Sequence, residues 1–169
     1  MFQPAKPPIL GPGAENNHAR PYDVFTEAER RYLDGASLGR LATADADGRP
    51  HVIPVCFALQ EGTVVTPIDE KPKRGDPDEL RRSRDIRENP RVSLVVDHYA
   101  SDWSNLGWVQ VRGTAGHVTP GEPSHAGAVS ALRATYDQYA SHALSERPII
   151  RIEPGRVLSW GTLDRPVND

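Results

Sequence analysis

The chain has 169 residues, a length that fits one domain built around a single hydrophobic core. Its formal net charge of -3 and isoelectric point near 6.1 give no electrostatic case for a nucleic-acid-binding protein. One cysteine, Cys56, excludes a disulfide framework within the chain and favours a reducing, cytoplasmic location. Neither the N-terminal region nor any other segment has an apolar run that could serve as a signal peptide or cross a membrane.

Residues 1–21 are rich in proline and glycine and contain little that could be buried. Such a composition cannot offset the entropy lost on ordering, so we expect a disordered N-terminal arm before a folded domain over residues 22–169. Apolar residues make up 37% of the chain, and the mean hydropathy is -0.56. These values are low for a domain of this size, which indicates disorder in one part or packing against a partner.

The first predicted helix begins after Thr26, which forms a capping box with Glu29, and ends at Gly35. Residues 38–43 then read as a strand, and residues 45–48 as a tight turn with glycine in the left-handed position. We expect residues 51–59 to form one further strand, covered on both faces because it is almost continuously apolar. Pro54 marks an edge, a bulge or a place where backbone faces a ligand.

A short strand over residues 63–66 completes a second hairpin, and two successive hairpins favour an antiparallel sheet. A helix is predicted from Pro77 to about Glu88, capped by Asp76, with strands over 91–97 and 107–117 after it. Residues 122–143 are predicted as the longest helix, with Val129, Leu132, Tyr136 and Tyr139 as its apolar stripe. Two final strands are expected over 148–152 and 156–160. The pattern predicts an α+β, mainly β fold, a small antiparallel barrel flanked by helices.

The segment 66–75 concentrates cations in a loop that prolines and a glycine stiffen. Two of the three lysines of the chain, Lys71 and Lys73, stand here beside Arg74, and Arg81, Arg82 and Arg84 follow in the next predicted helix. Such cations can bind a phosphate or a carboxylate, Arg in a bidentate way. The alternative is a solvated charged loop whose cations pair with nearby acids.

Trp103, Trp108 and Trp160 lie in strands or near their ends and could stack on a planar ring, although buried tryptophans more often anchor a core or an interface. The histidines show no metal-ligand spacing, and no nucleophile motif is present. Cys56 lies in an apolar strand and reads as a core thiol. Asp97–His98 and Asp102–Trp103 could supply a proton donor or could be polar loop pairs.

Two segments resemble the pyridoxamine 5'-phosphate oxidase-like split barrels: residues 38–55 match the opening hairpin of that family, and residues 86–97 its helix-to-strand segment. The stretch 66–74 is similar to an actinobacterial branch of F420-dependent enzymes. The resemblance covers about residues 24–160. It implies an antiparallel split β-barrel and a homodimer with a cofactor site at each subunit interface.

The resemblance also implies positions for the cofactor-binding residues. The second strand would lie along the ring system, and the third would approach the ring or its ribityl chain. A basic pair before Ile86 would hold the phosphate, extra cations would suit the longer anionic tail of F420, and one tryptophan would reach the cofactor from the second subunit. In that order these residues are Val52, Ile53, Pro54 and Val55; Thr66 and Pro67; Arg81 and Arg82; Lys71, Lys73 and Arg74; and Trp108.

The C-terminal segment 159–166 departs from the pyridoxal-binding signature of the family, since Trp160 and Arg165 are only weak matches to it. Vitamin B6 oxidation is therefore not expected. The resemblance instead implies a reductase that passes a hydride from F420 to a small conjugated organic substrate, with no catalytic side chain required. The alternatives are an FMN oxidoreductase with the same pocket and a non-catalytic protein that binds F420, FMN or haem.

Overall fold

The computed structural model describes residues 24–68 and 80–164 of the chain. Within these residues, three α-helices flank a seven-stranded sheet in which every adjacent pair is antiparallel. The elements are α1 Glu27–Asp34, β1 Gly39–Ala44, β2 Pro50–Val55, β3 Ala58–Gln60, β4 Thr63–Pro67, α2 Arg81–Glu88, β5 Arg91–His98, β6 Gly107–Val118, α3 Pro123–Thr135 and β7 Ile149–Gly161, with short 3-10 turns η2 Trp103–Asn105, η3 Asp137–Ser141 and η4 Leu144–Glu146.

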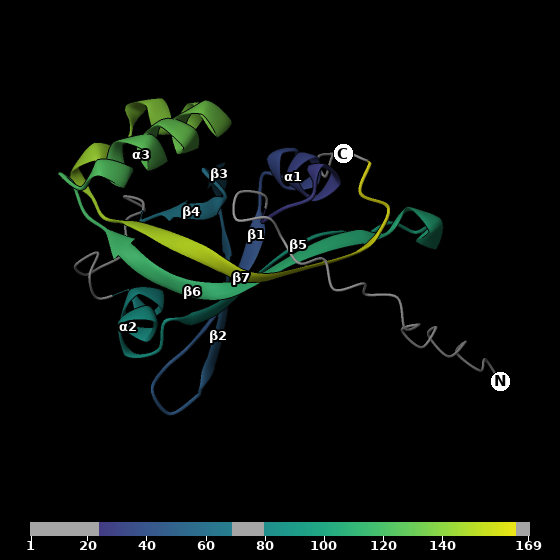
Figure 1. Ribbon diagram of the computed structural model, residues 1–169, viewed down its shortest axis with the longest axis horizontal. Helices are drawn as coiled ribbons and strands as arrows, with labels where there is room; N and C mark the ends of the chain where they lie inside the picture. Colours follow the sequence, from purple (N-terminus) through teal and green to yellow (C-terminus); the bar gives the residue numbers. More distant parts are fainter. Residues whose placement is uncertain (1–23, 69–79, 165–169) are drawn as a thin grey trace.

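The strand order is β2-β1-β5-β6-β7-β4-β3, so strands β2 and β3, which follow each other in the chain, lie at opposite edges of the sheet. The chain passes from one edge to the other at Cys56 and Phe57, and the sheet therefore coils into an open barrel. Strands β6 and β7 pair along almost their whole length through the middle of the molecule (Figure 1). The predicted antiparallel split-barrel fold is confirmed.

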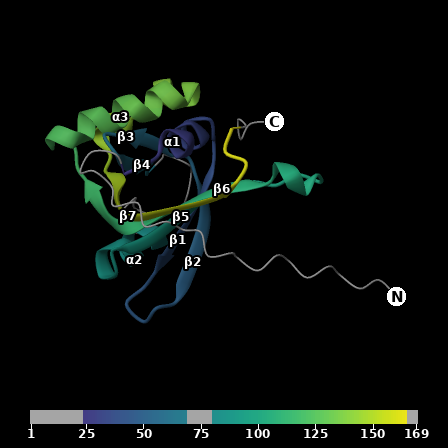
Figure 2. The ribbon, with the colours of Figure 1, turned by 45° about the vertical axis from the view of Figure 1, so that its right-hand side comes forward.

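Helix α3 covers β3 and β4 at one end of the barrel, whereas α2 lies on the opposite side of the sheet and packs against β1 and β6 (Figures 1 and 2). The four residues of the predicted apolar stripe are buried in one cluster with Val65 and Ile149: Val129, Leu132, Tyr136 and Tyr139. Helix α1 begins with the predicted capping box at Thr26 and ends at Gly35. No helix among the described residues is long and apolar enough to cross a membrane.

The prediction of one strand over residues 51–59, covered on both faces, was wrong. Strand β2 ends at Val55 and alternates between exposed and half-buried residues, and Val52 is 60% exposed. The break leaves the backbone of Phe57 without a strand partner, and the hydroxyl of Tyr136 takes its place. Its oxygen accepts from the Phe57 N–H at 2.9 Å and lies 2.8 Å from the carbonyl of the same residue.

The same tyrosine explains why the helix predicted over 122–143 ends at Thr135. Tyr136 has an extended backbone (φ -132°, ψ 109°), which turns its side chain towards Phe57, and the chain continues as the 3-10 turn η3. Tyr139 packs edge-on against Tyr136, with ring centroids 5.4 Å apart. A tertiary contact thus overrides the helical periodicity of this segment.

Two further element boundaries differ from expectation. The strands predicted over 148–152 and 156–160 form one strand, β7, because a register shift opposite Arg112 and Gly113 absorbs Pro154 without ending the ladder. Helix α2 begins at Arg81, after a non-helical Leu80, so a start at Pro77 was wrong. The predicted cap Asp76 and the predicted arm, residues 1–21, lie outside the described residues.

Candidate functional site

The end of β4 and the start of α2 bring buried polar groups together. The side chain of Thr66 is 1% exposed, and its hydroxyl has no hydrogen-bond partner among the described residues. The next residue, Pro67, offers its carbonyl to Nη2 of Arg82 at 3.3 Å. Arg82 is itself only 7% exposed, which is rare for a guanidinium. The predicted residues Thr66, Pro67 and Arg82 are therefore brought together.

Helix α2 turns polar side chains towards the sheet although most of its sequence is charged. Ser83 is fully buried, and its hydroxyl finds no hydrogen-bond partner in the part of the chain that the structure describes. Buried polar atoms are almost always satisfied in native proteins, so the hydroxyls of Thr66 and Ser83 each call for an explanation. At the β4–α2 junction, a bound group that supplies an acceptor or a donor would satisfy the Thr66 hydroxyl.

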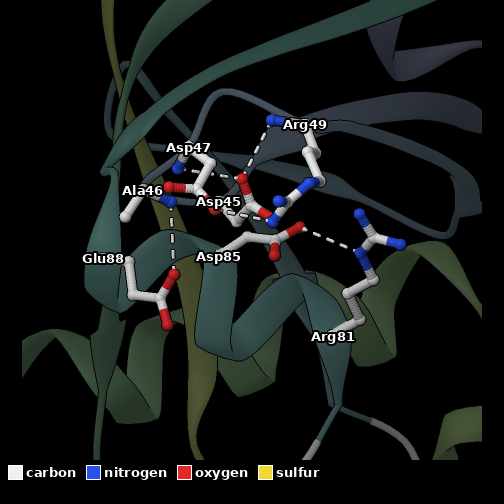
Figure 3. Close-up of polar contacts among 7 residues, drawn as sticks. All are labelled: Asp45, Ala46, Asp47, Arg49, Arg81, Asp85 and Glu88. Atoms are coloured by element: carbon white, nitrogen blue, oxygen red, sulfur yellow. Dashed lines mark hydrogen bonds and ion pairs between the residues drawn. The ribbon is translucent and has the colours of Figure 1, made fainter.

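Asp85 organises the other side of the helix. One carboxylate oxygen, Oδ2, accepts from the hydroxyl of Thr43 at 2.6 Å and lies 3.7 Å from Nδ1 of His51 and 3.9 Å from Nε of Arg81. Figure 3 shows Arg81 directed at Asp85 along the helix surface. Because the Arg81 side chain is 46% exposed, it remains accessible to a ligand while the carboxylate fixes its orientation.

The turn between β1 and β2 is tied to the end of the same helix. The N–H of Ala46 donates to Oε2 of Glu88 at 3.2 Å, and Arg49 forms ion pairs with Asp45 and Asp47 (Figure 3). The backbone N–H of Arg49, which donates to the Asp45 carboxylate, is the main cause that lowers the pKa of this group. The turn thereby holds β2 and α2 in a fixed relation.

One face of the strands β2, β1, β5, β6 and β7, which we call the outer face, carries side chains that reach solvent. Cross-strand partners share a face in an antiparallel sheet, so the registers define its members. The outer face consists of Val52 and Pro54, Arg40 and Ala42, Ser93, Val95 and Asp97, Trp108, Gln110 and Arg112, and Arg156, Leu158 and Trp160. The contacts of α1 and α2 with these strands are made by residues of the opposite face, such as Ser159 and Thr43.

Only some of the residues predicted to lie along the cofactor ring have side chains on the outer face. Val52 and Pro54 are exposed on it, whereas Val55 is 7% exposed and belongs to the core, and Ile53 packs against that core. Only Val52 and Pro54 can therefore offer side chains to a ligand on this face. Ile53 and Val55 could contribute backbone atoms alone.

Trp108 and Trp160 are direct cross-strand partners on the outer face. Trp160 is 44% exposed, and Trp108 is half-buried. Strands β1 and β5 lie between Trp108 and β2, which corresponds to about 14 Å at the usual strand spacing. Within one chain the two tryptophans are thus remote from Val52, as expected if a tryptophan acts from a second subunit.

The remaining predicted residues, Lys71, Lys73 and Arg74, lie outside the described residues. The sequence interpretation did not single out Asp85, His51 or Ser83. One signal in the sequence could have identified Asp85. It stands among arginines in a predicted helix and next to the apolar Ile86, and a carboxylate on the buried side of a helix needs a cation or a hydroxyl nearby. Among the described residues there is no group of three histidine, cysteine or acidic side chains that could hold a metal ion.

Comparison with known proteins gives a consistent result. The family described as pyridoxamine 5'-phosphate oxidase matches residues 25–161. A 5a,11a-dehydrotetracycline/5a,11a-dehydrooxytetracycline reductase of Streptomyces rimosus is 32% identical over 138 residues, which is 81% of this chain and 83% of the reductase.

Solved structures share the fold at lower identity. An F420 reductase matches with a TM-score of 0.58 and 23% identity, over 79% of this chain and 98% of that one. A heme-binding protein of Mycobacterium smegmatis matches with a TM-score of 0.62 and 23% identity, over 83% of this chain and 56% of that one. At this identity the likeness concerns the fold alone.

Proposed function

Because the chain belongs to the pyridoxamine 5'-phosphate oxidase family, we propose that it is an oxidoreductase that uses F420 to reduce a small conjugated organic substrate. The 32% identity to a reductase of dehydrotetracyclines supports reductase activity, and the fold shared with an F420 reductase is consistent with this cofactor. Segment 66–84 contains six lysine and arginine residues among five acidic ones, and the six cations are the groups proposed to bind the anionic groups of the ligand.

The observation that carries the proposal is the buried, unpartnered hydroxyl of Thr66 beside the Pro67–Arg82 contact. A ribityl chain ending in a phosphate has the hydroxyls and the charge that fit this junction. Thr66 would hydrogen-bond the ribityl chain, while Arg82 and the half-exposed Arg81 would bind the phosphate in a charge-assisted way. The residues present therefore fit the group.

Reduced F420 supplies a hydride for an electron-poor double bond, so the work of the protein is binding and orientation. Arg82 is anchored by the Pro67 carbonyl, and Asp85 orients Arg81, so neither must be ordered when the ligand arrives. Val52 and Pro54, which are exposed in the single chain, would provide an apolar surface for the ring.

We further propose a homodimer in which the exposed apolar residues of the outer face, Val52, Pro54 and Trp160, contact the second copy. In a single chain Val52, at 60%, and Trp160, at 44%, are large exposed apolar side chains on this face, and Pro54 is exposed on the same strand as Val52. Apolar surface of this kind marks an interaction site. A second copy would bring its Trp108 and Trp160 towards the β2 of the first, which a single chain cannot do.

FMN is the second candidate cofactor, and one observation favours it. The cations that the structure brings to the β4–α2 junction are Arg81 and Arg82, a pair suited to one phosphate. F420 needs further cations for its glutamates, and Lys71, Lys73 and Arg74 are the proposed ones. Charge reversal by Lys71→Glu with Lys73→Glu should weaken F420 binding about tenfold or more and FMN binding far less.

A parallel titration of the purified protein with F420 and with FMN, followed by tryptophan fluorescence, tests the choice of cofactor. Tighter binding of F420 supports the proposal and leads to assays of conjugated acceptors with the reduced cofactor. Tighter binding of FMN transfers the proposal to flavin chemistry. Binding of either without turnover of any acceptor would indicate a non-catalytic binding protein, and binding of neither would contradict the proposal.

Two buried threonines of β4 offer a matched pair for the site itself. In Thr63 the hydroxyl donates to the Gln60 carbonyl at 2.7 Å, whereas the Thr66 hydroxyl has no partner among the described residues. Thr66→Val should leave the apoprotein as stable as before or more stable, because an unsatisfied hydroxyl is removed, and should weaken cofactor binding about tenfold. Thr63→Val should destabilise the fold by about 1 kcal/mol and leave the cofactor affinity unchanged. If the Thr66→Val variant binds the cofactor as tightly as the wild type, the β4–α2 junction is not part of the cofactor site.

A further inference from the structure

A row of residues crosses the outer face from β2 to β7 and ends in two arginines. Successive registers place Val52 opposite Ala42, Ala42 opposite Ser93, Ser93 opposite Arg112, and Arg112 opposite Arg156. Arg112 and Arg156 are both exposed and directly face each other across the β6–β7 ladder. Like charges in this relation destabilise a sheet, so the pair needs compensation.

No acidic side chain among the described residues compensates the two arginines. The other charged pairs of this side of the sheet are already formed, Arg40 with Asp97 and Arg151 with Glu153, the latter at 2.8 Å. Arg112 is held instead by a neutral group, since its Nε donates to Oε1 of Gln110 at 2.9 Å. This contact orients the guanidinium and leaves its two Nη groups available.

An unpartnered hydroxyl and a shift in the strand register lie beside the arginine pair. The hydroxyl oxygen of Ser93, the cross-strand neighbour of Arg112, is buried and has no hydrogen-bond partner in the described part of the chain. The register of β6 and β7 shifts between Arg112 and Gly113, directly beside the arginine pair. Bulges of this kind re-aim side chains and are frequent next to functional sites.

We propose that Ser93, Arg112 and Arg156 form an oxyanion-binding site on the outer face, separate from the β4–α2 junction. Its ligand is a carboxylate or phosphate group, which two guanidiniums bind in a bidentate way while the Ser93 hydroxyl donates a further hydrogen bond. Arg112, on the middle strand of the site, lies three strands from Val52, or about 14 Å at the usual strand spacing. A ligand whose ring rests on Val52 can therefore place an anionic group there, and so can a separate anionic ligand.

The test measures the rise of the melting temperature with inorganic phosphate at constant ionic strength. The wild type is compared with Arg112→Gln/Arg156→Gln and with Arg31→Gln, a control that removes an exposed cation paired with Glu27 on α1. We expect the double variant to bind phosphate about tenfold more weakly or to lose most of the rise, and the control to behave as the wild type. Without phosphate the double variant should be at least as stable as the wild type, because the repulsion is gone.

The same dependence on phosphate in the double variant and the wild type would overturn the proposal. A Ser93→Ala variant gives a second reading, since it keeps both charges and should still weaken phosphate binding several-fold. A single Arg156→Gln variant is measured as well, so that the test does not depend on the folding of one variant. If all three variants bind phosphate as tightly as the wild type, the site is contradicted.

A second arm identifies the source of the anion. The double variant is titrated with F420 and with the riboflavin-like fragment of F420 that lacks phosphate and glutamates. A selective loss of F420 binding assigns the site to the anionic tail of the cofactor, whereas unchanged binding of both assigns it to a separate anionic ligand. Failure of the wild type to bind F420 would refute the proposed function and leave the phosphate result standing, so the two proposals fail separately.

Discussion

At the scale of single residues, Tyr136 is the side chain on which the barrel closure most depends. Its hydroxyl contacts the backbone of Phe57 at the break between β2 and β3 and also lies 3.1 Å from the carbonyl of Ser37. Burial is the main cause that raises the pKa of Tyr136 to about 12. One side chain thus joins the end of α3, the start of β1 and the crossing point of the chain.

Tyr136→Phe should destabilise the fold by about 1–3 kcal/mol, because it leaves a buried N–H and carbonyl unsatisfied. The pKa is raised in the folded state, so the stabilising effect is complete below about pH 10, the unfolded value, and is lost as the pH rises through about 12. Chemical denaturation of both proteins over this range measures it. The exposed Tyr99→Phe is the control and should change the unfolding free energy by less than about 0.5 kcal/mol. A difference between wild type and Tyr136→Phe that grows with pH would contradict the role given to this hydroxyl.

At the scale of elements, the β6–β7 ladder owes its length to the register shift at Gly113. A Cβ atom at Gly113 would collide with the backbone carbonyl of Glu153, whereas one at Gly116 in the same strand would meet nothing within 4 Å. Close approach of the two backbones therefore requires glycine at the first position only.

Gly113→Ala should destabilise the protein by about 1–3 kcal/mol, because the backbone of β7 must shift. Gly116→Ala should be neutral or slightly stabilising, since alanine restricts the unfolded chain more than glycine does. The unfolding free energies of both variants measure this contrast. Equal effects of the two substitutions would show that the backbone contact at Gly113 is not limiting.

Most of the elements could be predicted from local signals, and the errors have a common physical origin. The capping box at Thr26, the left-handed Gly48 in the β1–β2 turn and the buried stripe of α3 followed from residue type and spacing alone. The break after Val55, the end of α3 and the continuous β7 did not, because each depends on contacts between residues distant in sequence. That Thr66 and Arg82 serve one site was implied by family resemblance, whereas the Asp85 contacts and the arginine pair depend on tertiary structure.

At the scale of the whole molecule, the outer face is the surface on which the proposed dimer depends. Val52→Glu would replace an exposed apolar contact of the proposed interface with a charge and should convert the dimer to monomer. Light scattering coupled to size-exclusion chromatography measures the mass of the wild type and the variant. Ser130→Glu, an exposed position on α3, adds the same charge away from this face and should leave the mass unchanged. A wild type that is monomeric at all concentrations, or a Val52→Glu variant that stays dimeric, would contradict the assignment of this face.

The two edges of the sheet carry a consequence for how the protein behaves at high concentration. Strand β2 has proline at Pro50 and Pro54, which lack an N–H, and β3 at the other edge is only three residues long. An unpaired strand edge can pair with strands of other chains. The prolines of β2 remove hydrogen-bond donors that such pairing needs, and the short β3 offers few residues for it. Aggregation by addition of strands from other chains is thereby disfavoured at both edges of the open barrel.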